Sequence, residues 1–141
     1  MRMRVLTSIV GVALIHSTAI AIAHHAFSAE FDASKPVELT GVVTKTEWIN
    51  PHSWITIDVR LDDGTTEVWE IEAGAPNSMF RRGFTHDSLP LGTEIVVTGY
   101  QARDGGRRAN GRNLTLPDGT LLFVGSSGIG APRDGADPSD R

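Results

Sequence analysis

The sequence predicts an all-β fold, an OB-like barrel of five strands with one short helix between the third and fourth strands. Three segments rich in Val, Ile and Thr come first, a single helix-like segment follows, and two more strand-like segments complete the pattern. These segments are residues 37–49, 53–61, 65–73, 75–84, 89–100 and 113–125. This order of elements is that of the OB-fold. A different small β-barrel and an open sandwich remain as alternatives.

The first strand-like segment, residues 37–49, carries Gly41 near its middle. A glycine inside a strand often marks a bulge or a bend, and small barrels need strongly coiled strands. Residues 50–52, Asn-Pro-His, have the chemistry of a turn. We therefore expect the chain to bend sharply near Gly41 and to turn before the second strand.

The second segment, residues 53–61, alternates between apolar and polar side chains, which is typical of a strand with one buried face. The expected inner residues are Ile55, Ile57, Val59 and Leu61, and the outer ones are Trp54, Thr56, Asp58 and Arg60. Asp62, Asp63 and Gly64 predict a tight hairpin turn into the third strand. There, Trp69 and Ile71 share the inner face, with Glu70 and Glu72 opposite.

The period changes in residues 75–84, where we expect about two turns of helix. Pro76 suits the first helical position, and Gly83 suits a left-handed residue just after the helix. Phe84 would then pack back on Met79 or Phe80. After the fourth strand, residues 101–112 are expected to form a long loop rich in Gly and Arg, and residues 113–125 a strand, a turn and a short return strand.

The first 23 residues have the features of an export signal. Arg2 and Arg4 precede an apolar run at residues 5–15, which is too short to span a bilayer unaided. Cleavage after Ala23 fits the small-x-small pattern of signal peptidase, and cleavage after Ala21 fits it too. An uncleaved anchor is the remaining alternative. After cleavage we expect no stable membrane span, and a periplasmic or secreted protein.

The predicted domain organisation follows from these patterns. It comprises a signal peptide (1–23), an N-terminal arm (24–36), an OB-like domain (37–124) and a disordered tail rich in Gly, Pro, Ser and Asp (125–141). The mature chain would hold 11 basic and 17 acidic side chains, a formal net charge of −6. That balance argues against nucleic acid as a partner, because binding to phosphates relies on Lys and Arg. The absence of cysteine excludes disulfides and thiolate metal sites.

The chain resembles a family of small secreted bacterial proteins of unknown function. The resemblance covers nearly all of residues 24–124 and rests on the Asn-Pro-His turn at 50–52, the Trp-Glu-Ile-Glu strand at 69–72, the Arg-Gly helix end at 82–83 and the Leu-Pro-Asp-Gly turn at 116–119. It implies an exported, barrel-like domain. It brings no established activity, so the function has to come from the residues.

Two histidines, His24 and His25, follow the predicted cleavage site directly. Cleavage after Ala23 would give His24 a free α-amine, which can chelate a metal ion together with its own imidazole. The pKa of such an amine is about 7.7–8.0, so a metal displaces its proton readily. Amine and imidazole donors suit Cu(II), with Zn(II) as the alternative, and His52 is the expected third point of a site. The competing interpretations are a solvated arm for the histidine pair and a purely structural role for His52 in its turn.

Other residues have weaker claims to a site. His86, Asp87 and Asp32 are further potential ligands, or ordinary surface residues. Trp54, on the outer face, is either covered by Phe27 or Phe31 of the arm or exposed as a stacking platform.

The loop at residues 101–112 is the one basic feature of the mature chain. Its Arg103, Arg107 and Arg108 could bind an anionic ligand through their guanidinium groups, or they could be solvated. No catalytic motif stands out, and paired carboxylates such as Glu70 and Glu72 are common on strands.

The sequence therefore predicts an exported binding or accessory module, not an enzyme, that binds Cu(II) or another divalent metal through its N-terminal histidines. The alternative is a metal-free OB-like module that binds an anionic glycan or a protein partner. In either case the partner is an unknown periplasmic protein or a small ligand.

Overall fold

The computed structural model describes residues 27–125 and Pro132. Two helices and six strands follow one another along the chain: α1 (Phe27–Glu30), β1 (Phe31–Glu47), β2 (Trp54–Arg60), β3 (Thr66–Glu72), α2 (Pro76–Arg81), β4 (Glu94–Ala102), β5 (Arg108–Thr115) and β6 (Leu121–Phe123). The predicted all-β class, with one short helix between the third and fourth strands, is confirmed. The sixth strand, β6, is the short return strand expected within residues 113–125. Helix α1 is a single turn that the sequence patterns do not predict.

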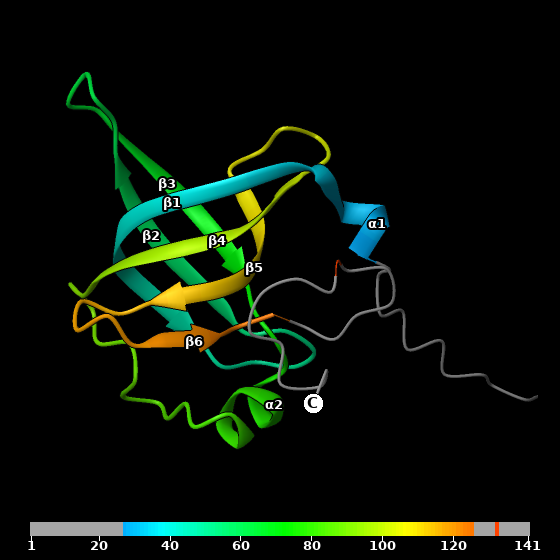
Figure 1. Cartoon of the computed structure of the whole chain (residues 1–141), viewed down its shortest axis with the longest axis vertical. Helices are drawn as coiled ribbons and strands as arrows, with labels where there is room; N and C mark the ends of the chain where they lie inside the picture. Colours follow the sequence, from blue (N-terminus) through cyan, green and yellow to red (C-terminus); the bar gives the residue numbers. More distant parts are fainter. Residues whose placement is uncertain (1–26, 126–131, 133–141) are drawn as a thin grey trace, which may run out of the picture.

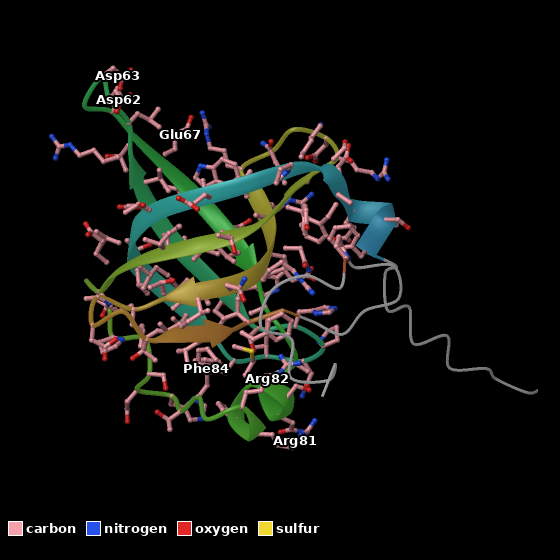
Figure 2. All side chains as sticks on the ribbon, viewed as in Figure 1. Asp62, Asp63, Glu67, Arg81, Arg82 and Phe84 are labelled. Carbon is pink, nitrogen blue, oxygen red and sulfur yellow. The ribbon has the colours of Figure 1, made fainter. Side chains whose placement is uncertain are left out.

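The strands close into a barrel-like ring (Figure 1). Their order in the sheet is β3-β2-β1-β4-β5-β6, and β3 also pairs with β5 in parallel, which joins the two ends. All other pairings are antiparallel. The β2–β3 hairpin projects from the ring, with Asp62 and Asp63 at its tip (Figure 2). The connection between β1 and β2 contains a cis peptide bond at Asn50–Pro51.

The long strand β1 pairs with β4 and with β2, and its register shifts at two places: against β4 between Phe31 and Pro36, and against β2 between Val43 and Lys45. The second shift lies near Gly41, where an irregularity was expected, but Gly41 itself pairs in regular register with Ile95. The absence of a side chain at Gly41 leaves space for Ile57 of β2. A Cβ atom at this position would lie 3.1 Å from the Cβ of Ile57 and 2.9 Å from the carbonyl oxygen of Asp58.

Helix α2 begins and ends as its sequence predicts. Pro76 is its first residue, and Gly83 follows it with a φ of 96°. The backbone amide of Phe84 donates to the carbonyl of Met79 at 3.2 Å, and that of Gly83 donates to Phe80 at 3.1 Å, which is the Schellman arrangement. Phe84 and Met79 both belong to the buried main core, as the expected packing of Phe84 on this helix requires. Figure 2 shows Arg82 on the side of α2 towards the strands and Arg81 on the opposite side.

The glycine- and arginine-rich loop is shorter than the sequence predicts. β4 continues to Ala102 and β5 already begins at Arg108, so the connection is residues 103–107. The first residues of β5 look like a loop because they are small or polar, but β4 and β3 pair with them from both sides. A Cβ atom on Gly111 would come within 2.8 Å of Ile71 Cγ2 and 2.9 Å of Val124 Cγ2. The absence of a side chain at Gly111 therefore allows Ile71 and Val124 to pack directly against its backbone.

The main core fills the inside of the ring. Alternation in β2 and β3 places Ile55, Ile57 and Ile71 there, with exposed fractions of 1% or less. Trp69 is buried as expected, whereas Leu61 is 36% exposed. Leu61 lies beyond the end of β2 in the hairpin turn, where its amide donates to Thr65, so it leaves the alternating pattern.

A second, smaller core lies under α1. Phe27, Phe31 and Ala102 are buried together and pack against Tyr100, with the rings of Phe27 and Tyr100 edge to face at 5.6 Å. Much of the segment expected as an arm, residues 24–36, therefore belongs to α1 and to the start of β1. The predicted signal peptide and most of the predicted tail lie outside the described residues.

Candidate functional site

Four side chains form a row across neighbouring strands on the outer face of the ring. Trp54 pairs with Glu72, Glu72 with Asn110, and Asn110 with Tyr100. Side chains of directly paired residues lie on the same face of a sheet. The row therefore runs over β2, β3, β5 and β4, opposite the face that carries Ile55 and Ile71.

His52 joins this row beside Glu72. Its Nδ1 lies 3.7 Å from Oε1 of Glu72, and the amide Nδ2 of Asn110 donates to the same oxygen at 3.1 Å. Glu72 is 7% exposed and Asn110 is 1% exposed. A separation of 3.7 Å is too long for a hydrogen bond. It suits either an ion pair with a protonated imidazole or two donors around one metal ion.

Burial raises the pKa of the Glu72 carboxyl, and the nearby negative charge of Glu30 adds to this rise. His52, the hydrogen bond from Asn110 and the charge of Arg108 act in the opposite direction, but burial is the largest influence. The carboxylate is therefore held in a place where its charge is poorly solvated. Buried charges in proteins are normally paired or bound to a metal.

Two further polar atoms near His52 in the sequence or the sheet are buried without a hydrogen-bond partner in the part of the chain that the structure describes. They are Oδ1 of Asn110, which belongs to the row, and Oγ of Ser53, the residue between His52 and Trp54. Buried polar atoms nearly always have a partner. The backbone around Ser53 is firmly held, because its amide donates to Gly74 and its carbonyl accepts from Ala73. The turn that carries His52 is thus fixed against the end of β3.

Helix α1 begins beside Tyr100, the last residue of this row. Phe27 packs on Tyr100, the backbone amide of Arg103 donates to Glu30 at 2.9 Å, and Nε of Arg103 donates to the carbonyl of Ser28 at 2.6 Å. These contacts fix the point from which the preceding chain starts. His24 and His25, the first two expected ligands, lie outside the described residues. Among the described residues, no three His, Cys, Asp or Glu side chains come together as a metal site.

The expected anion-binding arginines have partners within the chain. Arg103 bonds to α1, Arg107 forms an ion pair with Glu67 at 2.7 Å, and Arg108 lies 3.4 Å from Asp104. Arg112, which the sequence places in the same loop, is in β5 and is 2% exposed.

Arg112 is engaged on two sides. Its guanidinium stacks on the ring of Phe123 at 4.9 Å and donates to the carbonyl of Pro132 at 2.5 Å.

The remaining predicted site residues lie apart from His52. His86 packs against Trp48 and Phe80, with ring centroids 6.0 and 5.0 Å apart. Asp32 accepts hydrogen bonds from the amide and hydroxyl of Ser34, which lower its pKa.

Trp54 is half-buried beside Glu72. The two candidates expected to cover it, Phe27 and Phe31, instead pack on Tyr100.

Sequence reasoning missed Glu72 and Asn110 as partners of His52. The alternation in residues 65–73 does place Glu72 on the outer face, the face of Trp54. The missing information is the parallel pairing of β3 with β5, which joins residues 38 positions apart. No local pattern marks that pairing.

The comparisons with known proteins identify a family but no function. A family model described as a family of unknown function, DUF6152, matches residues 12–112. No curated protein and no solved structure matches the chain. Within the residues that the structure describes, no helix is long and apolar enough to cross a membrane.

Proposed function

The chain belongs to the DUF6152 family of unknown function, and we propose that it is an exported, periplasmic module that binds a divalent metal ion. The proposed ligands are His24, with its α-amine and imidazole, together with His25 and His52. Cu(II) is the preferred ion and Zn(II) the alternative. Cleavage of the signal peptide after Ala23 creates the amine ligand, so export and metal binding are coupled in this proposal.

The observation that carries the proposal is the position of His52. Its Nδ1 is buried and lies 3.7 Å from a carboxylate oxygen of Glu72 in a cluster of buried polar groups. An ordinary turn histidine would face solvent, whereas the side chain of His52 is only 20% exposed. An imidazole nitrogen held beside a buried carboxylate is a combination that metal sites use.

The place of α1 supports the same proposal. Phe27 is fixed against Tyr100, which pairs with Asn110 in the row that contains Glu72. His24 and His25 stand three and two residues before Phe27. A chain spans at most about 3.3–3.6 Å per residue, so these histidines are within about 10–11 Å of a fixed point. Glu30, at the other end of α1, is close enough to Glu72 to influence its pKa.

The proposal is tested by titrating the exported protein with Cu(II). The natively processed protein should bind Cu(II) more tightly than a form with one extra residue before His24, because that residue moves the α-amine away from the imidazole. N-terminal sequencing has to accompany the titration. A protein that begins at Ile22, or equal affinity of the native and extended forms, would refute the amine site.

A pair of histidine variants provides the matched control. His52→Ala should weaken Cu(II) binding while leaving the fold intact, because His52 lies in a turn at the edge of the core. His86→Ala, an exposed histidine in the aromatic cluster beside α2, should leave the Cu(II) affinity unchanged. Equal effects of both substitutions would show that copper binds histidines non-specifically.

The metal-free alternative, binding of an anionic glycan or a protein partner, has less support. It relies on the guanidinium groups of Arg103, Arg107 and Arg108, and the first two already bond to Ser28 and Glu67. An anion would have to compete with these internal partners.

A further inference from the structure

We propose that a pocket on the outer face of the ring binds a small organic carboxylate, and that Arg112 of β5 recognises the carboxylate group. β1, β4 and β5 lie side by side (Figure 1), and residues of all three strands line this pocket, which has a volume of about 320 Å³. That volume is at the lower end of the range for small-molecule sites. The inference is independent of the proposed metal site, since none of the described residues that line the pocket is a proposed metal ligand.

The register between β1 and β4 forms most of the pocket wall. Pro36 of β1 pairs with Tyr100 of β4, so their side chains share the outer face. Glu38 and Thr98 form another pair on that face. These four residues line the pocket together with Val37. The lining therefore combines the apolar surface of a proline, a valine and a tyrosine with a hydroxyl and an exposed carboxylate.

A β-bulge places Arg112 at this pocket. Thr98 of β4 pairs with Asn113 of β5. The next residue of β4, Gly99, already pairs with Gly111, so Arg112 is the extra residue of a bulge. Bulges often redirect a side chain next to a functional site. Arg112 is only 2% exposed, and yet it belongs to the lining of an open pocket.

Contacts on two sides hold the guanidinium of Arg112 in place. It stacks on the ring of Phe123 at 4.9 Å and donates to the carbonyl of Pro132 at 2.5 Å. A guanidinium has five N–H donors in a planar fork, which matches the two oxygens of a carboxylate. Because these contacts already orient the fork, little conformational freedom is lost when a ligand binds. A bound carboxylate would share the guanidinium with the carbonyl of Pro132 and, unlike that carbonyl, would bring a negative charge to it.

The rest of the lining defines the chemical class of the ligand. Tyr100 is held edge to face against Phe27, with ring centroids 5.6 Å apart. Together with Pro36 and Val37, it offers apolar surface to the body of a ligand. The negative charge of Glu38 disfavours a second anionic group in the same pocket. The pocket therefore fits a monocarboxylate with an apolar body better than a dicarboxylate or a phosphate.

Benzoate is the probe for this pocket, and benzamide, which has a similar shape and no charge, is its control. In the unsubstituted, ¹⁵N-labelled protein, benzoate should shift the amide NMR signals of Val37, Glu38, Thr98 and Tyr100 in a saturable manner. Benzamide should bind about tenfold more weakly or less, because a hydrogen bond to a charged group contributes more than one between neutral groups. This comparison requires no variant, so it does not depend on how well a substituted protein folds.

Arg112→Lys tests the guanidinium, with Arg82→Lys as its matched control. Arg82 stacks on the same ring of Phe123, at 4.8 Å, but it is not part of the pocket lining. Lysine keeps the positive charge but cannot bind a carboxylate through two parallel N–H bonds. Arg112→Lys should weaken benzoate binding by about tenfold, whereas Arg82→Lys should leave it unchanged. Far-UV circular dichroism and thermal melting show whether each variant is folded.

Glu38→Gln tests the charge at the pocket. Removal of this exposed carboxylate should tighten benzoate binding by about two- to threefold at low salt, since exposed charges interact weakly and are screened by ions. Weaker binding in Glu38→Gln would contradict the assignment of a negative ligand.

Three results would overturn the inference. The first is that benzoate causes no saturable shifts in the pocket signals, or shifts mainly those of residues 103–107 with their surface arginines. The second is equal affinity for benzoate and benzamide, which would show an apolar cavity that does not recognise a carboxylate. The third is an equal effect of Arg112→Lys and Arg82→Lys. None of these results bears on the Cu(II) titrations, so the pocket and the proposed metal site stand or fail separately.

Discussion

Replacing Ile57 with alanine should severely destabilise the ring of strands. Ile57 is 0% exposed at the centre of β2, and its backbone pairs with Val43 on one side and Trp69 on the other. The substitution removes three carbon atoms from the core. At about 0.8 kcal/mol for each buried carbon, the loss of burial alone amounts to roughly 2.4 kcal/mol.

The cavity adds to this loss because the surroundings cannot fill it easily. Gly41 of β1 lies directly against Ile57 and has no side chain that could move in. The neighbouring strands, β1 and β3, are held in place by their backbone pairing with β2. We therefore expect the free energy of unfolding to fall by about 3–5 kcal/mol, in the upper part of the range for such substitutions.

Urea denaturation, followed by tryptophan fluorescence, measures this effect. Thr56→Ala is the matched control, because Thr56 is the next residue on the opposite, partly exposed face. It should shift the denaturation midpoint far less than Ile57→Ala, with similar slopes for both variants. Equal midpoint shifts would show that the assignment of faces in β2 is wrong.

Three further predictions concern the outer face and β5. Gly111→Ala should destabilise the fold, measured as a lower melting temperature, because a Cβ there would meet Ile71 and Val124 at 2.8 and 2.9 Å; an unchanged melting temperature would contradict the close packing of β5. In metal-free protein, Glu72→Gln should raise the melting temperature at neutral pH. Burial raises the pKa of Glu72, so its ionised form destabilises the folded state above that pKa, and the advantage of Gln should shrink as the pH falls through it; an advantage that grows on acidification would reverse the argument. The metal-free alternative predicts that replacing Arg107 and Arg108 with Ala abolishes retention on an anionic polysaccharide column at low salt, and unchanged retention would remove that alternative.

Local patterns in the sequence were sufficient to predict several elements. Alternation in residues 53–61 identified β2 and its inner face, because side chains in a strand point to opposite sides with a period of two. Pro76 and Gly83 predicted both ends of α2, since each favours a backbone conformation that suits one end of a helix. In each case the physical cause acts within a few residues.

The tertiary structure alone decided where β5 begins and what faces His52. Ala109, Asn110 and Gly111 have the composition of a loop, and they form a strand because β3 and β4 pair with them on both sides. That pairing brings Asn110 to Glu72 and closes the buried cluster around His52. Alternation reports which face a side chain is on, but the neighbours on that face depend on which distant strands join. Those contacts are set by the closure of the ring, so no local stretch of sequence encodes them.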